Sequence, residues 1–192
     1  MMNHQIVAGK MGRFVEKINN LLLLKPDEEQ MLDHASIYLG KLVEEDDWLP
    51  ESCTIPHPEH YQQYLLYRDP EERFSVVSFV WGPGQKTPVH DHTVWGLIGM
   101  LRGGEVEQRF EIVDGKVIPG ETHELKPGDV GQVSPTIGDV HQVANASQNE
   151  VSISVHVYGA DIGKVSRHVY TETGDTKTFI SGYTNNELPN LY

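Results

Sequence analysis

The first third of the chain carries apolar residues at the spacing of α-helices. In residues 11–24 they recur every three or four positions, which places an apolar stripe along one side of a helix. A second stripe runs through residues 31–42, and the acidic residues at 27–29 suit the positive end of a helix dipole. Residues 48–58 contain three prolines, which make a third helix improbable there. We therefore predict two amphipathic helices and a connector in residues 1–58.

Beyond this segment the pattern changes to short runs of β-branched and aromatic residues. Gly, Pro and Asp turns separate the runs at intervals that suit hairpins. The runs expected to form strands are residues 74–81, 93–101, 105–113, 131–134 and 151–157. So many short strands favour an antiparallel barrel or sandwich. We predict a mainly β protein, with one jelly-roll-like β-barrel and C-terminal segment in residues 59–192, and treat residues 1–192 as a single domain.

Composition narrows the class of partners. The 192 residues include 15 Lys or Arg and 28 Asp or Glu, a formal net charge of −13. No window holds the basic cluster that nucleic acids or anionic membrane surfaces require, so we expect neither as a partner. Residues 1–20 lack a secretion signal, the longest purely apolar run is residues 21–24, and Cys53 is the single cysteine. We expect a soluble, cytoplasmic protein that is a monomer or a weak homo-oligomer.

Two of the ten histidines flank one residue. His90 and His92 surround Asp91, and side chains on a strand alternate between its two faces. Both imidazoles would therefore share one face, where they can hold a metal ion. The alternative is a polar strand face that binds no metal.

The surroundings of these histidines favour the metal. Glycines, a proline and an asparagine stand at fixed spacings around these histidines and a third one: Gly84, His90, His92, Gly96, Gly103, Pro135, Gly138, His141 and Asn145. This spacing resembles the two signature motifs of the cupin superfamily, small β-barrels that bind a metal in the barrel mouth. The resemblance implies that His90, His92 and His141, here called the histidine triad, are metal ligands. Gly96 stands where cupins commonly have a glutamate ligand.

A ligand set of three neutral imidazoles would have chemical consequences. It would cap one face of an octahedral ion and leave three positions for substrate and gas. It would also keep the full charge of a divalent ion, which suits an anionic thiolate. Zinc with three histidines and water is the competing interpretation, and the sequence does not separate the two.

Residues 151–158 alternate between apolar and polar side chains without interruption. Ser154, His156 and Tyr158 therefore stand on one strand face, close enough for the serine to orient the imidazole and the imidazole to bond the phenol. We call these three residues the serine–histidine–tyrosine row. Taken alone, the row is typical of a polar ladder inside a barrel. Beside a metal motif, a functional role is the better interpretation.

The triad and this row together resemble the cysteine-dioxygenase-type thiol dioxygenases. Flanking segments 81–84 and 134–138 add to the likeness, which spans residues 61–183. The resemblance implies a mononuclear non-haem Fe(II) that converts a thiol and O2 into a sulfinic acid. It also implies a small thiol carboxylate as the substrate.

Several positions depart from the animal enzymes of this group. Gly96 occupies the place of the cysteine that they crosslink to tyrosine, so no crosslink is expected. Gln63 occupies the place of their carboxylate-binding arginine, and residues 159–161 replace their Ser-Pro-Pro. These changes resemble the bacterial branch that prefers 3-mercaptopropionate. In that branch an arginine after the tyrosine strand binds the carboxylate, and Arg167 is the candidate.

These likenesses assign expected roles. Arg167 would clamp the carboxylate, Gln63 would add an uncharged donor, and Tyr158, held by His156, would donate a hydrogen bond to substrate or oxygen. Arg167 could instead be an ordinary surface arginine, and Gln62 could be the inward residue. The other six histidines are read as surface or structural. The rival functions are a cupin enzyme using Zn, Mn or Ni and a non-catalytic cupin that binds a small ligand.

Overall fold

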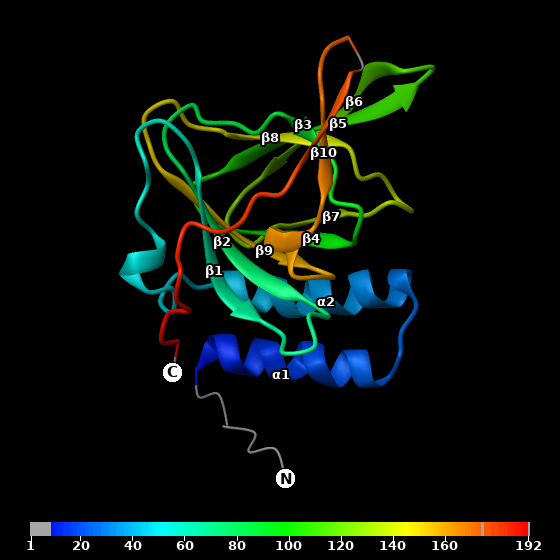
Figure 1. Ribbon diagram of the computed structural model, residues 1–192. Helices are drawn as coiled ribbons and strands as arrows, with labels where there is room; N and C mark the ends of the chain where they lie inside the picture. The colour runs from blue at the N-terminus through cyan, green and yellow to red at the C-terminus, as the bar shows by residue number, and fades with distance from the viewer. Residues whose placement is uncertain (1–8, 174, 192) are drawn as a thin grey trace.

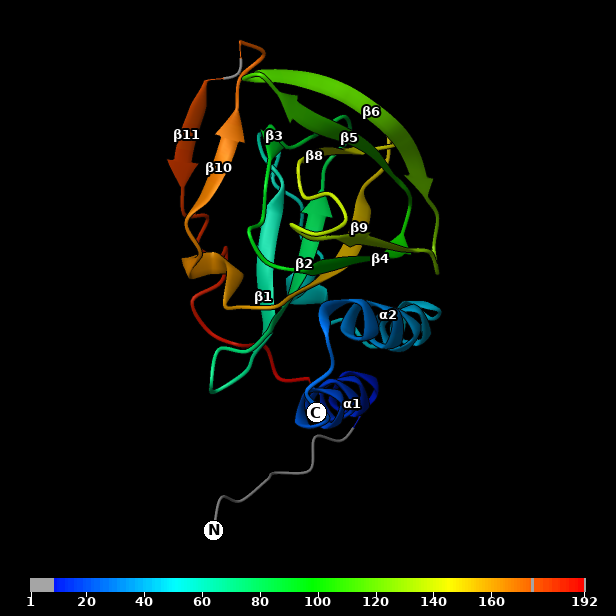
Figure 2. The ribbon, with the colours of Figure 1, turned by 90° about the vertical axis from the view of Figure 1, so that its right-hand side faces the viewer.

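The computed structural model describes residues 9–173 and 175–191, and residues 1–8, 174 and 192 lie outside this description. It begins with two helices, α1 (Lys10–Leu23) and α2 (Glu28–Val43), that pack side by side beneath the sheets (Figures 1 and 2). Asp27 caps α2 in a reciprocal capping box with Gln30, which satisfies backbone donors at the helix start. The predicted N-terminal helical segment is confirmed.

No helix in the described part of the chain is both long enough and apolar enough to cross a membrane. The connector after α2 contains one short 3-10 turn, η1 (Glu51–Cys53), and then enters the first strand. A second 3-10 turn, η2 (Ile162–Lys164), lies between the strands at residues 152–158 and 167–170.

Two antiparallel sheets form the rest of the molecule. The first has the order β1-β2-β9-β4-β7, with strands β1 (Gln62–Arg68), β2 (Ser75–Trp81), β9 (Ser152–Tyr158), β4 (Gly96–Arg102) and β7 (Val130–Val133). The second has the order β11-β10-β3-β8-β5-β6, with strands β11 (Thr176–Phe179), β10 (Arg167–Tyr170), β3 (Val89–His90), β8 (His141–Asn145), β5 (Glu105–Val113) and β6 (Lys116–Leu125).

The mainly β prediction is confirmed, and all five predicted strands are present within a few residues of their expected ends. Six further strands, β1, β3, β6, β8, β10 and β11, were not singled out, because their side chains are mixed or largely polar. The two sheets face each other and no ladder of described residues joins them into a closed barrel (Figure 2). Strand β3 also ends at His90, so His92 lies just beyond it.

The two faces of the first sheet differ in composition: one packs on the helices and is apolar, and the other carries both polar and apolar side chains. Ile153, Val155 and Val157 of β9 belong to the core that the helices share, while alternate residues of the same strand point toward the second sheet. Gly99 of β4 lets α2 approach closely, because an added Cβ would lie 2.8 Å from Leu39 Cγ. One large apolar cluster therefore lies between the first sheet and the helices. The space between the sheets holds the polar side chains together with two smaller apolar clusters, which include Trp81 with Val143 and Met100 with Leu125.

Candidate metal centre and cavity

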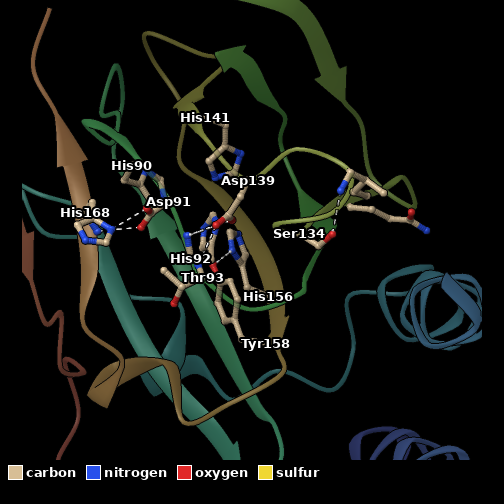
Figure 3. Close-up of polar contacts among 12 residues, drawn as sticks. His90, Asp91, His92, Thr93, Ser134, Asp139, His141, His156, Tyr158 and His168 are labelled. Atoms are coloured by element: carbon tan, nitrogen blue, oxygen red, sulfur yellow. Dashed lines mark hydrogen bonds and ion pairs between the residues drawn. The ribbon is translucent and has the colours of Figure 1, made fainter. Parts of the chain in front are cut away.

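The histidine triad comes together at the space between the sheets. His90 ends β3, His92 follows in the adjoining loop, and His141 begins β8 directly opposite His90 in the strand register. The potential ligand nitrogens of the three residues lie within 4.8 Å of one another, and all three side chains are buried. Their rings converge in Figure 3. The strand pairing, rather than any local motif, brings His141 to the other two.

Two of these imidazoles have their Nδ1 atoms occupied by acceptors. His90 Nδ1 lies 3.0 Å from the Pro88 carbonyl oxygen, and His92 Nδ1 lies 2.9 Å from Asp139 Oδ1. Asp139 also accepts from the backbone NH groups of His92 and Thr93, which fixes its position. With the ring proton on Nδ1, the lone pair of each imidazole is on Nε2 and free to bind a metal.

The third imidazole is held by a buried carboxylate. His141 Nδ1 lies 2.7 Å from Glu107 Oε1, and Arg109 Nε lies 3.6 Å from Glu107 Oε2. Burial opposes ionisation of Glu107, but the bond to His141 and the charge of Arg109 hold its pKa below the usual value. An ionised Glu107 orients the ring and increases the basicity of His141 Nε2.

The electrostatics of the triad suit a cation. Burial, together with the neighbouring imidazoles, lowers the pKa of His90 and His92 well below the ordinary value. Both rings are therefore neutral near pH 7, as metal ligands must be. Imidazole nitrogens with oriented lone pairs fit a divalent transition metal.

The serine–histidine–tyrosine row forms a continuous hydrogen-bonded chain on β9. Ser154 Oγ lies 2.8 Å from His156 Nε2, and His156 Nδ1 lies 2.8 Å from Tyr158 Oη. Trp81 Nε1 donates to Ser154 Oγ at 3.3 Å, and the Phe79 ring stacks on His156 with centroids 4.0 Å apart. Both nitrogens of His156 are thus engaged, so this imidazole is not free to act as a metal ligand.

Tyr158 reaches from this chain to the triad. Its ring stacks on His92 with a centroid separation of 5.3 Å. Gly96 makes room for the ring, since an added Cβ would lie 2.9 Å from Tyr158 Cδ1. Burial raises the pKa of Tyr158 far above its usual value, so the phenol keeps its proton. Tyr158 is therefore placed as a hydrogen-bond donor next to the triad.

A cavity of about 240 Å³ opens beside these groups. Residues of both sheets and of the segment after β11 line it: Tyr61, Gln63, Phe79, Trp81, Thr87, Pro88, His90, His141, Val143, His156, Tyr158, Arg167, Val169, Phe179 and Ser181. Gln63 is among them and Gln62 is not, which answers the question of register that the sequence left open. The volume suits a small molecule rather than a polymer.

Arg167 lines the same cavity as His156 and Tyr158. Its Nη2 donates to Ser181 Oγ at 2.7 Å, and the guanidinium lies 4.6 Å over the Phe179 ring. The side chain is 3% exposed, its Nε atom is buried without a hydrogen-bond partner, and no carboxylate of the described residues forms an ion pair with it. Burial lowers the pKa of Arg167 from the ordinary arginine value. A buried cation with unused donors faces the cavity.

Asp91 links the two histidine ligands to the strand of Arg167. Its carboxylate accepts from the backbone NH and the ring of His168 and from the Tyr170 hydroxyl, each at 2.8 Å. Asp91, which directly follows β3, therefore points toward His168 of β10 (Figure 3). His168 stands apart from the triad and serves as one of these partners.

Several residues of the site were not identified from the sequence. Asp139 precedes His141 inside the downstream motif, and its spacing was the only available signal. Glu107 occupies an inward position of a predicted strand, where an acid is unusual and therefore informative. Phe179 and Ser181 belong to a polar C-terminal segment that carries no periodic pattern.

Comparisons with known proteins identify the family of the chain. The family model described as cysteine dioxygenase type I matches residues 54–170, more than half of the 192-residue chain. The cysteine dioxygenase type 1 proteins of Rattus norvegicus and Bos taurus are 29% and 30% identical to it over 90 residues. That match covers 45% of this chain and 44% of each relative, so the chain spans less than half the length of these relatives.

Solved structures show more distant likeness. A Klebsiella pneumoniae protein with a double-stranded beta-helix domain aligns with a TM-score of 0.48 at 20% identity, covering 60% of this chain and 84% of that one. A cupin superfamily protein from Desulfitobacterium hafniense aligns with a TM-score of 0.43 at 16% identity, covering 60% and 97%. By the extent of the family match, the chain belongs to the cysteine dioxygenase type I family.

Proposed function

We propose that this protein is a mononuclear non-haem iron thiol dioxygenase, which oxidises a small thiol carboxylate with O2 to the sulfinic acid. The observation that carries the proposal is that one cavity contains both the histidine triad and the buried, unpaired Arg167 guanidinium. A buried cation without a counter-ion is costly, so an anionic group of the substrate is the natural partner. Family membership supports a thiol at the other end of that substrate.

Arg167 would bind the substrate carboxylate. Its planar donors match the two oxygens of a carboxylate, and its contacts with Ser181 and Phe179 fix the direction in which the free donors point. Gln63 lines the same cavity and would add an uncharged donor at the carboxylate end. The benefit of such a clamp is positional, because it fixes the sulfur atom relative to the triad.

The triad would hold the metal through its three Nε2 atoms. When bound there, a ferrous ion would supply positions for the thiolate and O2 and the electrons that activate O2. The chain contributes the orientation of the rings through Pro88, Asp139 and Glu107. With three neutral imidazole ligands, the metal site would keep enough positive charge to stabilise a thiolate.

Tyr158 would donate a hydrogen bond to the bound substrate or oxygen. Its buried phenol keeps its proton, and His156 fixes the position of the hydroxyl. Phe79, Trp81 and Val143 line the same cavity and would exclude water from the reacting atoms. Charge that develops beside Tyr158 would be stabilised by a donor that is already in place.

The lining of the cavity supports 3-mercaptopropionate rather than cysteine as the substrate. These two thiols share a carboxylate and differ in the ammonium group of cysteine. The described residues that line the cavity include no Asp or Glu, so an ammonium group would find no counter-ion there. A thiol carboxylate without the amine would avoid this desolvation cost. We therefore propose 3-mercaptopropionate as the preferred substrate.

Oxygen uptake by the iron-loaded protein tests the proposal. The panel consists of 3-mercaptopropionate, cysteine, cysteamine and 1-propanethiol, which separate the carboxylate from the amine. We expect the highest kcat/KM with 3-mercaptopropionate, a lower value with cysteine, and background rates with the two thiols that lack a carboxylate. The absence of uptake with every thiol would refute the proposed activity, and equal rates across the panel would refute the role of Arg167.

A further inference from the structure

Glu105 is a buried acid that the reaction described above does not use. It begins β5, where its register partners are Asn145 of β8 and Leu125 of β6, and its exposed fraction is 0%. Both carboxyl oxygens are buried without a hydrogen-bond partner, and no described residue forms an ion pair with it. An isolated buried carboxylate is strongly disfavoured, so Glu105 is expected to carry a proton.

The polar groups that face this carboxyl come from the first sheet. They are the Ser154 hydroxyl on β9 and the Trp81 indole NH on β2, and Glu107 on the same strand is the charged group that acts on it. Asn145 and Leu125 on the flanking strands add no charge. Burial raises the pKa of Glu105 to about 8, although Ser154 and Trp81 act in the opposite direction.

Ser154 is also the end of the chain that leads to Tyr158. A serine hydroxyl donates one hydrogen bond and accepts up to two. Trp81 occupies one acceptor position at 3.3 Å, because an indole NH can only donate. The single Ser154 proton can therefore point either to His156 Nε2, 2.8 Å away, or toward Glu105.

We propose that Glu105 sets the direction of the whole hydrogen-bond chain and thereby decides whether Tyr158 can donate into the cavity. Protonated Glu105 turns its hydroxyl to Ser154 Oγ and forms a hydrogen bond that neither carboxyl oxygen makes in the structure, so Ser154 donates to His156 Nε2. His156 then carries its proton on Nδ1 and donates to Tyr158 Oη. The Tyr158 proton is left free to point toward the triad.

Loss of the Glu105 proton reverses this order. A carboxylate only accepts, so the Ser154 hydroxyl donates to Glu105, His156 donates from Nε2 to Ser154, and Tyr158 donates to His156 Nδ1. Each proton moves one position along the chain, and the proton that leaves is released from Tyr158 to water in the cavity. The number of protons on Ser154, His156 and Tyr158 is unchanged. Only their directions differ, and Tyr158 no longer donates into the cavity.

Glu105 is thus a positioning residue that acts through Ser154 and His156. Its predicted effect on turnover rests on the proposed role of Tyr158, whereas the direction of the chain does not. For this reason the first test is independent of thiol oxidation. It measures which nitrogen of His156 carries the proton.

The first experiment records ¹⁵N–¹H spectra of the histidine rings in protein loaded with diamagnetic Zn(II). The His156 signals are assigned by their loss in His156→Asn. We expect His156 to carry its proton on Nδ1 at pH 6 and on Nε2 at pH 9.5 in the wild type. Glu105→Gln cannot ionise and should keep the proton on Nδ1 throughout. An unchanged tautomer in the wild type, or the same change in Glu105→Gln, would overturn the proposal.

The second experiment compares pH profiles of kcat in the iron-loaded protein with 3-mercaptopropionate. We expect equal kcat values for the wild type and Glu105→Gln at pH 6, and a ratio of roughly tenfold in favour of Glu105→Gln at pH 9.5. The matched control is Ser152→Ala, a buried hydroxyl on the same strand, which should keep the wild-type profile. In a Tyr158→Phe background the Glu105→Gln difference should vanish. A difference that persists there would show that Glu105 does not act through Tyr158.

Discussion

The histidine triad and His156 are four buried imidazoles with opposite arrangements of partners. Each triad member has an acceptor at Nδ1, namely Pro88, Asp139 or Glu107, and keeps its Nε2 lone pair free. His156 has Ser154 at Nε2 and Tyr158 at Nδ1, so neither nitrogen is available. The difference lies in the neighbours rather than in the residue type. One set of partners prepares a ligand, and the other prepares a hydrogen-bond relay.

Removal of a triad imidazole should have the largest effect. His141→Ala takes away one of three ligands and leaves Glu107 without its partner, so we expect loss of stoichiometric iron and of activity. Metal analysis after dialysis measures the first. His156→Ala is the comparison, since it should keep its iron. Retention of one iron per chain by His141→Ala would contradict the assignment of the triad.

Arg167→Ala should have the next largest effect. Removing the carboxylate partner is expected to lower kcat/KM for 3-mercaptopropionate by roughly 10²-fold to 10³-fold, mainly through KM. Rates with a thiol that lacks the carboxylate should hardly change. Arg102→Ala, which removes an exposed arginine paired with Asp46, is the control and should behave as the wild type. An equal loss with both thiols would remove Arg167 from the substrate site.

Tyr158→Phe tests the relay at its cavity end. Losing one donor beside the reacting atoms should reduce kcat by about 10²-fold while iron content and thermal stability stay near the wild-type values. Tyr64→Phe removes another tyrosine hydroxyl, which bonds the Ile55 carbonyl away from the cavity, and should leave kcat unchanged. If Tyr158→Phe lost its iron instead, the tyrosine would have a structural role.

Glu107→Gln tests the support of the triad. A neutral amide holds the His141 ring less firmly than a carboxylate, so iron affinity should fall by about 10-fold to 100-fold. Competition with a chelator of known affinity measures the change. Glu111→Gln on the exposed part of the same strand should show the wild-type affinity. Equal affinities for both variants would mean that Glu107 does not tune the ligand.

Glu105 should also give stability an unusual dependence on pH. Its folded-state pKa of about 8 lies above the value of 4.5 for an unperturbed glutamate, so the folded state binds more protons between these limits. The free energy of unfolding should therefore fall by about 1.4 kcal/mol per pH unit as pH rises through this window. Denaturant titrations at several pH values measure the slope. Glu105→Gln should lack this component, and identical slopes would contradict a buried, protonated Glu105.

The sequence predicts the histidine side of the site better than the substrate side. Alternation along an expected strand predicts that His90 and His92 lie together, although His92 falls just beyond β3, and the spacing of the downstream motif points to His141. Local patterns therefore name the three residues, and the pairing of β3 with β8 brings His141 to the other two. The serine–histidine–tyrosine row follows from the same alternation. These residues lie in or beside short segments whose periodicity survives in the final fold.

The groups that complete the site come from segments without such a pattern. Phe179 and Ser181 reach Arg167 through the pairing of β10 with β11, and these two strands are too polar to be recognised from the sequence. The burial of Glu105 is likewise a property of the assembled sheets. Tertiary pairing, which no local propensity encodes, decides these positions.

The pairing of β3 with β10 fixes the distance between Arg167 and the histidine triad. Val169 stands opposite His90, so Arg167, two residues before it, is a diagonal neighbour of His90 on the same sheet face. Such neighbours are separated by about 7–8 Å, and by somewhat less at Cβ, a distance fixed by backbone hydrogen bonds rather than by flexible loops. An anion on Arg167 and an atom held at the triad are therefore kept a set length apart. We therefore expect the strand pairing to select substrates by the length of the chain between their anionic group and the atom held at the triad.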